Sequence, residues 1–132
     1  MKKVLVLCTG NSCRSIIAEA LINSELGDQY EAFSSGVSAS GKVNPNARKI
    51  LEKKNIWSDN YHSKTIESVL HLNFDLVITV CENANNTCPV FPRKTAVVHL
   101  GFDDPDGKGF NYFEACFEEI QSQLIPFLKN IN

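Results

Sequence analysis

The chain has 132 residues and a net charge of −2, from 13 Lys and Arg against 15 Asp and Glu in small scattered groups. One domain, residues 1–132, with its own hydrophobic core suits this length, whereas the nearly balanced charge excludes the basic surface of a nucleic-acid-binding protein. No apolar stretch approaches the roughly 20 residues of a membrane span and no signal peptide is recognisable, so we expect a cytoplasmic protein without a nucleic-acid or membrane partner.

Hydrophobic periodicity predicts strands that alternate with helices along the chain. Short apolar or β-branched runs indicate strands at 3–7, 30–35, 74–80 and 94–100. Apolar residues at helical spacing indicate helices at 14–26, 45–55, 63–72 and 110–131. Pro126 should kink or end the last helix. This alternation predicts an α/β fold: a four-stranded parallel sheet with helices on both faces, joined by right-handed crossovers.

The first predicted strand ends at Cys8, and a loop of small residues follows it and opens a helix. Unpaired N–H groups at a helix start, together with partial positive charge there, favour the binding of an anion. Arg14 is separated from Cys8 by five residues and has the planar fork that suits a tetrahedral oxyanion. The same surroundings lower the pKa of a thiol, so Cys8 is a candidate nucleophile. The alternative is an ordinary strand, loop and helix with a buried cysteine.

Two further cysteines, Cys81 and Cys88, flank six mostly polar residues directly after the third predicted strand. In a helix their Cα atoms would lie about 10 Å apart, from seven steps of 1.5 Å, whereas a disulfide needs roughly 7 Å or less. Three Asn in the segment make unwinding easy, because Asn favours turns over helices. The pair is therefore typical of a redox switch, although a buried strand-end cysteine and an incidental loop thiol would also fit.

The remaining cysteines and the histidines predict no metal site. The chain has five cysteines without a secretion signal, which favours reduced thiols over a disulfide framework. No two of them form a C-x2-C pair, and His62, His71 and His99 are not clustered near them at zinc-ligand spacing. Cys116 stands alone in the last predicted helix and is expected to fill space.

The Cys8 loop resembles the phosphate-binding loop of the low-molecular-weight tyrosine phosphatases and of the thioredoxin-coupled arsenate reductases with the same flavodoxin-like fold. The resemblance covers essentially the whole chain. The residues at 74–81, Cys88-Pro89 and 99–105 look like those of the arsenate reductases specifically. A phosphatase of this fold has no need of the second cysteine pair and usually carries Tyr where this chain has Asp106.

The resemblance implies a redox relay that starts from arsenate bound to the loop. Cys8 attacks arsenic, Asp104 donates a proton to the leaving oxygen, and Ser15 holds the thiolate by a hydrogen bond. A Cys8–Cys81 disulfide then forms with release of arsenite, and Cys88 converts it to a Cys81–Cys88 disulfide that thioredoxin reduces. The loop residues implied in oxyanion binding, where phosphate or sulfate could replace arsenate, are Thr9, Gly10, Asn11, Ser12, Cys13 and Arg14.

Two other functions remain open from the sequence. The first is a tyrosine phosphatase that hydrolyses phosphate monoesters through Cys8, Arg14 and Asp104. The second is a redox-regulated anion sensor without turnover. Residues 103–107 are also compatible with a plain turn, as Asp-Pro and Asp-Gly pairs often are. We expect a monomer with no bound cofactor, to which thioredoxin supplies the electrons.

Some relatives bind potassium beside the loop, and the resemblance assigns three of its surrounding positions to Asn11, Glu19 and Ser34. Where those relatives carry Asp, this chain has Thr65, preceded by Lys64. Because a carboxylate is missing and an ammonium group is added, we expect weak or no dependence on potassium.

Overall fold

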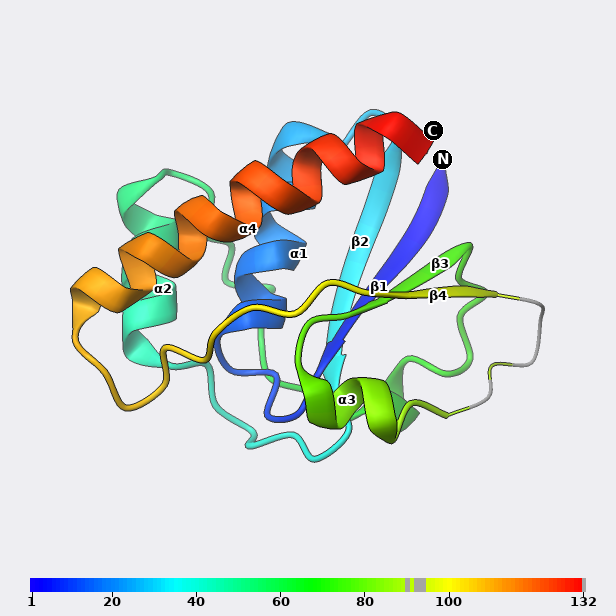
Figure 1. Cartoon of the computed structure of the whole chain (residues 1–132), viewed down its shortest axis with the longest axis horizontal. Coiled ribbons are helices and arrows are strands. Elements are labelled where there is room, and N and C mark those ends of the chain that lie inside the picture. The colour runs from blue at the N-terminus through cyan, green and yellow to red at the C-terminus, as the bar shows by residue number, and fades with distance from the viewer. Residues whose placement is uncertain (90, 92–94, 132) are drawn as a thin grey trace.

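The computed structural model describes residues 1–89, 91 and 95–131, and its centre is a parallel four-stranded sheet (Figure 1). The strands, in the spatial order β2-β1-β3-β4, are β1 (Lys2–Cys8), β2 (Tyr30–Gly36), β3 (Leu76–Thr79) and β4 (Ala96–His99). Val4 of β1 pairs with Ala32 on one side and Leu76 on the other. The predicted fold class is confirmed, and the parallel order brings the carboxyl ends of all four strands to one edge.

Three helices form the thicker layer on one face of the sheet. They are α1 (Arg14–Glu25), α2 (Pro45–Lys53) and α4 (Phe110–Ile131). Residues 15–22 of α1 are all buried, because β1 and β2 cover one side of this helix and α4 packs beside it. The Tyr30 hydroxyl donates to the Leu128 carbonyl at 2.9 Å and so ties β2 to the last turns of α4. Lys2 of β1 and Ile131 of α4 line one cavity at the amino end of the sheet.

The opposite face carries a thinner layer made of a 3-10 turn η1 (Ile66–Ser68), the short helix α3 (Glu82–Asn86) and aromatic side chains. Phe74 packs edge-on against Phe33 of β2, with ring centroids 5.8 Å apart, and against Phe91 at 6.5 Å. α3 lies at the carboxyl end of the sheet, beside the loop that follows β1 (Figure 1). Helical elements therefore cover both faces, but unequally.

Two predicted elements differ from the structure. The helix expected at 63–72 is wrong, since only Ile66–Ser68 is helical. Its first residues are extended because the Gly36 N–H donates to the Lys64 carbonyl and the Lys64 N–H donates to Asn11 Oδ1. These bonds to distant residues outweigh the local helical spacing. The segment becomes a wall of the loop after β1.

The predicted bounds of the last helix, 110–131, are confirmed by α4, which continues through Pro126 to Ile131; of the two effects expected of Pro126, a kink or an end, the helix does not end there. Pro126 lies on the exposed side of α4, where solvent can satisfy the carbonyl that loses its partner, and the buried Leu124 and Leu128 hold the turns around it. The predicted strand at 94–100 is shorter, as Ala96–His99, and its expected first residue, Lys94, lies outside the described residues.

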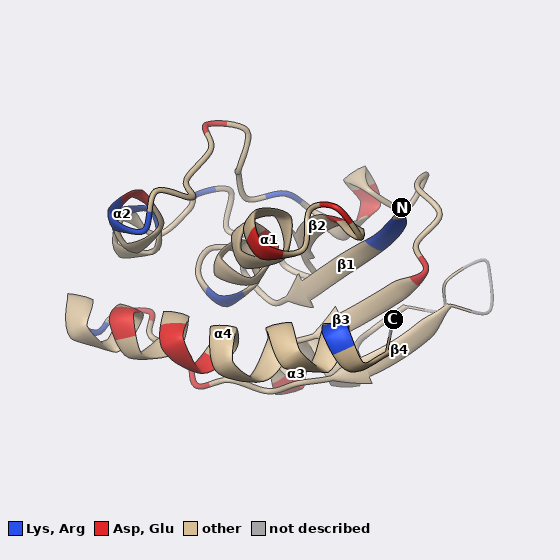
Figure 2. Ribbon diagram, turned by 90° about the horizontal axis from the view of Figure 1, so that it is seen from above, with Lys and Arg blue, Asp and Glu red and all other residues tan. Residues whose placement is uncertain are grey.

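Charged residues of both signs are spread over the helices, strands and loops (Figure 2). Several acidic residues lie on α4 and basic residues lie on the neighbouring α2, where Lys53 Nζ pairs with Glu114 of α4 at 2.9 Å. No helix within the described ranges is both long and apolar enough to cross a membrane.

Candidate active site

The loop between β1 and α1 lines a cavity of about 210 Å³ at the carboxyl edge of the sheet. Cys8 is the last residue of β1 and Arg14 the first residue of α1, so the strand and the helix hold the two ends of the loop. The cavity is lined by Cys8, Thr9, Gly10, Ser12, Cys13, Arg14, Ser40, Asp104 and Asp106. The predicted loop residues thus surround one cavity, except Asn11, which does not line it.

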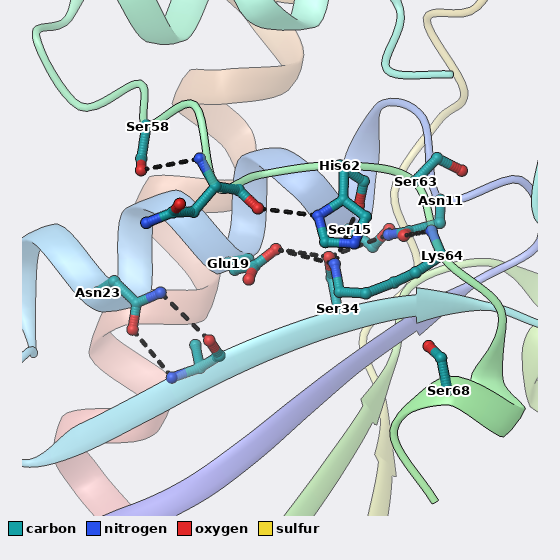
Figure 3. Close-up of polar contacts among 12 residues, drawn as sticks. Asn11, Ser15, Glu19, Asn23, Ser34, Ser58, His62, Ser63, Lys64 and Ser68 are labelled. Carbon is teal, nitrogen blue, oxygen red and sulfur yellow. Dashed lines mark hydrogen bonds and ion pairs between the residues drawn. The ribbon is translucent and has the colours of Figure 1, made fainter. Parts of the chain in front are cut away.

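Asn11 instead holds the loop from behind. It is fully buried, and its φ of 51° lies in the left-handed region that Asn tolerates better than most residues. Its Nδ2 donates to Ser15 Oγ at 2.8 Å and Ser34 Oγ at 3.0 Å, while its Oδ1 accepts from the Lys64 N–H at 2.8 Å (Figure 3). The side chain of Asn11 therefore joins the loop to α1, to β2 and to the segment before η1.

The end of β2 also presses against the loop. Gly36 pairs with Cys8, and a Cβ atom at Gly36 would lie 2.4 Å from the Thr9 carbonyl oxygen. Only glycine permits this close approach. The backbone of Thr9 and of Gly10 is held further by Ser38 and Ser40, whose N–H groups donate to the two carbonyls at 3.0 and 2.9 Å. The cavity is therefore rigid before any ligand enters.

The guanidinium group of Arg14 uses only some of its nitrogen atoms to bind other residues. Its Nη1 donates to the Phe102 carbonyl at 2.9 Å, and its Nη2 lies 3.5 Å from Asp104 Oδ2. Its Nε is buried and has no hydrogen-bond partner among the described residues. A buried N–H without a partner costs free energy, which an oxyanion in the cavity would recover by accepting it. The ion pair also brings Asp104 to the cavity, so residues 103–107 are not a plain turn at a distance from the site.

Cys8 lines this cavity, and Cys81 lies behind it, with Sγ 3.2 Å from Oγ1 of the cavity residue Thr9. Both cysteines are free thiols, are nearly inaccessible to solvent, and interact with each other. Their interaction lowers the pKa of Cys81 to about 5 and, together with burial, raises the pKa of Cys8, so the lowered pKa that the sequence predicted for Cys8 is wrong: the neighbouring Cys81 carries the charge instead. The pair therefore shares one proton and one negative charge at neutral pH.

Each sulfur of the pair has its own donors. Cys8 receives hydrogen bonds from Ser15 and from the backbone of Asn11, and the charge of Arg14 also lowers its pKa. Cys81 lies 3.2 Å from Thr9 Oγ1 and accepts from the Ala84 N–H at 3.4 Å. The negative charge can therefore be stabilised on either sulfur, as a relay of nucleophiles requires.

Cys88 lies beyond the end of α3, separated from Cys81 by the helix. It is half-buried, donates weakly to the Pro89 carbonyl at 3.7 Å, and burial raises the pKa of its thiol. α3 contains five residues, of which Ala84 alone is buried. Both thiols are free, and residues 82–86 between them form a helix.

Cys13 and Asp106 occupy the rim of the cavity. Asp106 accepts from Asn44 Nδ2 at 2.7 Å, and Cys13 Sγ lies 3.9 Å from the same Asp106 oxygen. Burial, with the nearby Asp106 carboxylate, raises the pKa of Cys13 to about 12. Cys13 is thus a neutral thiol at neutral pH, and the rim carries a carboxylate in place of an aromatic ring.

Glu19 and Lys64 form a buried polar cluster behind the loop (Figure 3). Ser34 Oγ donates to Glu19 Oε1 at 2.6 Å, and Lys64 Nζ lies 3.9 Å from the same carboxylate. Burial raises the pKa of Glu19, and the charge of Lys64 opposes this shift. Burial lowers the pKa of Lys64, and the charge of Glu19 opposes that shift. The resemblance assigned Asn11, Glu19 and Ser34 to the surroundings of a potassium ion. In the structure the ammonium group of Lys64 lies beside the Glu19 carboxylate. Insensitivity to potassium stays a prediction.

Sequence reasoning missed two residues near the site, Asn83 and His99, and one role of a third, Thr9. Thr9 reaches Cys81 through its side chain as well as lining the cavity, Asn83 donates to Thr9, and His99 lies between α3 and β3. Thr9 was predicted only as an oxyanion-binding residue. A polar residue one position into α3 or at the end of β4 carries no signal of its own, because these contacts depend on how the strand ends meet.

A nucleophilic cysteine, an anion-binding loop and a helix-start arginine at the carboxyl edge of a parallel sheet define a cysteine enzyme that acts on oxyanions. The model of the low molecular weight phosphotyrosine protein phosphatase family matches residues 3–132, and the chain belongs to that family.

Relatives within the family include arsenate reductases. An arsenate reductase of Bacillus cereus (strain 03BB102) is 43% identical over 126 residues, which cover 96% of this chain and 93% of that protein. A solved arsenate reductase in the phosphate binding state matches over 100% of both chains with a TM-score of 0.85 and 27% identity. The thioredoxin-dependent arsenate reductase of Corynebacterium glutamicum shares the fold, with a TM-score of 0.81 at 24% identity over 99% of this chain and 62% of that chain.

Proposed function

We propose that this protein reduces arsenate to arsenite by a relay of three cysteines and is regenerated by thioredoxin. The observation that carries the proposal is the interaction of Cys81 with Cys8 beside the anion cavity, where Cys81 Sγ lies 3.2 Å from Oγ1 of the cavity residue Thr9. A phosphatase needs one nucleophilic sulfur in this place, whereas a reductase needs a second thiolate within reach of the first.

In the first step the loop amides and Arg14 bind arsenate, the proton shared by the two cysteines moves from Cys8 to Cys81, and the Cys8 thiolate attacks arsenic. A sulfur–arsenic bond forms, and one arsenic–oxygen bond breaks as the leaving oxygen takes a proton from Asp104, which must be protonated for this step, and departs as water. Arg14 Nε supplies a donor that has no other partner in the described structure. The arsenic atom remains pentavalent at this stage.

In the second step Cys81 gives up its proton to the Asp104 carboxylate left by the first step, and its thiolate attacks the sulfur of Cys8. The Cys8–Cys81 disulfide forms, and the sulfur–arsenic bond breaks with its electron pair on arsenic, which leaves as arsenite. The two thiolates have supplied the two electrons. Cys88 then attacks Cys81, which releases the Cys8 thiolate and moves the disulfide to Cys81–Cys88. α3 must unwind for this last exchange, because a disulfide cannot span its length.

The exposed position of α3 supports reduction by an external dithiol. Glu82, Asn83, Asn85 and Asn86 of this helix are all exposed, so a Cys81–Cys88 disulfide formed on unwinding would lie at the surface. Thioredoxin is a protein dithiol of suitable potential to reduce such a bond. No bound cofactor has a role in these steps.

The direct test is arsenate-dependent consumption of NADPH in the presence of thioredoxin and thioredoxin reductase. We expect turnover with the native chain and none with Cys81→Ser or Cys88→Ser. Absence of turnover by the native chain, with rapid hydrolysis of aryl phosphates, would show that the protein is a phosphatase.

Hydrolysis of phosphate monoesters is the second candidate function, favoured by the ion pair that holds Asp104 beside Arg14. Cys8, Arg14 and Asp104 would perform it without Cys81. We therefore expect Cys81→Ser to keep measurable p-nitrophenyl phosphate hydrolysis while arsenate reduction is lost. Cys8→Ser, the matched control, should lose both activities.

A further inference from the structure

We infer that Asn83 is a positioning residue for the second sulfur transfer: it fixes the hydroxyl group of Thr9 as a hydrogen-bond donor to Cys81. The inference rests on the proposed function for its place in the reaction. The arrangement of the groups stands apart from it and can be measured without arsenate.

Three groups from two elements form a short chain of hydrogen bonds. Asn83 Nδ2 donates to Thr9 Oγ1 at 3.0 Å, and Thr9 Oγ1 lies 3.2 Å from Cys81 Sγ. Either atom of the second contact could supply the proton if it stood alone. The amide nitrogen of Asn83, however, can only donate. Thr9 must therefore accept from Asn83, and its single hydroxyl proton is left to point at Cys81.

The sulfur of Cys81 thereby becomes an acceptor from several directions. The hydroxyl of Thr9 reaches it from the oxyanion loop, and the Ala84 N–H reaches it from α3 at 3.4 Å. The titratable or charged groups that act on it are Cys8 from β1 and Arg14 from α1. Donors to a sulfur favour its thiolate form. They also hold Cys81 against Cys8, the sulfur that it must attack.

The same bonds explain how α3 could be released at the right stage. Once Cys81 is part of a disulfide its negative charge is gone, and the hydrogen bond from the Thr9 hydroxyl to this sulfur becomes weak. The bridge from Asn83 to the loop is then weakened. Two contacts at the sheet end remain, Thr79 Oγ1 with Asn85 Oδ1 at 3.4 Å and His99 Nε2 with Glu82 Oε2 at 3.5 Å. Both are long, so oxidation of Cys81 favours the unwinding that Cys88 needs.

Substitutions of Asn83 have a matched control on the same helix. Asn83 and Asn86 are both exposed residues of α3, and the side chain of Asn83 bonds to Thr9. Asn83→Ala removes the donor and leaves the Thr9 hydroxyl free to rotate. Asn83→Asp offers only acceptors, so it draws the Thr9 proton away from Cys81. Asn86→Ala and Asn86→Asp make the same changes in composition and charge at the last residue of α3.

The first measurement is the pH titration of each cysteine by ¹³C NMR of chains labelled at cysteine Cβ. The interaction with Cys8, with the hydrogen bonds from Thr9 and Ala84, lowers the pKa of Cys81 to about 5. We expect the Cys81 midpoint to rise by about 0.5 to 1 unit in Asn83→Ala and by more in Asn83→Asp, because a lost or reversed donor destabilises the thiolate. The Asn86 variants should move it by no more than about 0.2 unit. An unchanged midpoint in both Asn83 variants would overturn the inference.

The second measurement is arsenite release in a single turnover, with each variant compared to the native chain at the same pH. A midpoint that rises by about 0.5 to 1 unit lowers the thiolate fraction about two- to fivefold at pH 5 and hardly at all at pH 8. We therefore expect the deficit of Asn83→Ala at pH 5 to disappear at pH 8. An equal deficit at both pH values would mean that Asn83 merely supports the helix. If the native chain releases no arsenite while the NMR midpoints shift as described, the proposed function fails and the positioning of Cys81 stands.

Discussion

The two strand ends that carry the reacting cysteines are built in opposite ways. After β1 the chain enters a loop whose Asn11 is fully buried and makes three hydrogen bonds, and a 12-residue helix follows. After β3 it enters α3, a helix of five residues with Ala84 alone buried. The first arrangement holds an anion in fixed geometry. The second can be unwound at small cost, since little apolar surface is lost. A relay that begins with a bound oxyanion and ends with a displaced disulfide needs both.

The largest expected effects come from removing the first sulfur of the relay, Cys8, and then the last, Cys88, in separate variants. Cys8→Ser should lower arsenate reduction and aryl phosphate hydrolysis alike by about 10³-fold or more, because both begin at this nucleophile. Cys88→Ser should still release one arsenite per chain and then stop with Cys8 and Cys81 joined. Rapid-quench assays of arsenite and mass spectrometry of the disulfide check both outcomes. Repeated turnover by Cys88→Ser would remove this cysteine from the relay.

A second test separates the reactive thiols from the inert ones by their ionisation. The pair of Cys8 and Cys81 holds one charge, with a pKa for Cys81 of about 5, whereas burial raises the pKa of Cys13 and of Cys116 to about 12. The thiolate absorbance near 240 nm should therefore rise by one equivalent per chain as the pH increases through about 5, and then stay level to pH 8. Cys81→Ser should abolish this step, and Cys116→Ser should keep it. A native chain without any thiolate at pH 7 would contradict the shared-proton description.

The rigidity of the first loop predicts a clear difference in stability between two Asn substitutions. Asn11→Ala removes three side-chain hydrogen bonds, two of them buried, and places Ala at φ 51°, so we expect the free energy of unfolding to fall by about 2 to 4 kcal/mol. Asn86→Ala in the exposed α3 should change it by less than about 0.5 kcal/mol. Urea denaturation followed by circular dichroism measures both. Similar losses in the two variants would mean that the loops do not differ in rigidity.

The smallest effect is expected from exchanging potassium for sodium. The ammonium group of Lys64 lies 3.9 Å from Glu19 in the buried cluster behind the first loop. Because this internal cation already faces the carboxylate, arsenate reduction should differ by less than about twofold between potassium and sodium salts at equal ionic strength. Lys64→Met is the informative comparison. Strong stimulation of the native chain by potassium would show that the cluster still binds the ion.

Much of the molecule is predictable from local patterns. Apolar runs ending at Cys8 and around residues 76–79, the Asn44-Pro45 helix start and the apolar stripe of α4 follow from side-chain periodicity and capping, which depend on near neighbours in the chain. The wrong helix prediction at 63–72 occurs where hydrogen bonds to distant residues outweigh local helical spacing. Residues 63–65 have the spacing of a helix start but are extended, because they pair with Gly36 and Asn11. The last helix has its predicted bounds, and Pro126, expected to kink or end it, does not end it, because buried neighbours on both sides hold the turns around it.

The amino-acid sequence by itself determined the parallel α/β fold, the anion-binding loop with Cys8 and Arg14, and the presence of a second cysteine pair. Side-chain periodicity, small loop residues and cysteine spacing are properties of short segments, so they can be read without coordinates. Only the tertiary structure decided that Cys81 interacts with Cys8, that Asn83 donates to Thr9, and that Lys64 faces Glu19. These contacts join residues from different strand ends, and their geometry exists only once the sheet has brought those ends to one edge.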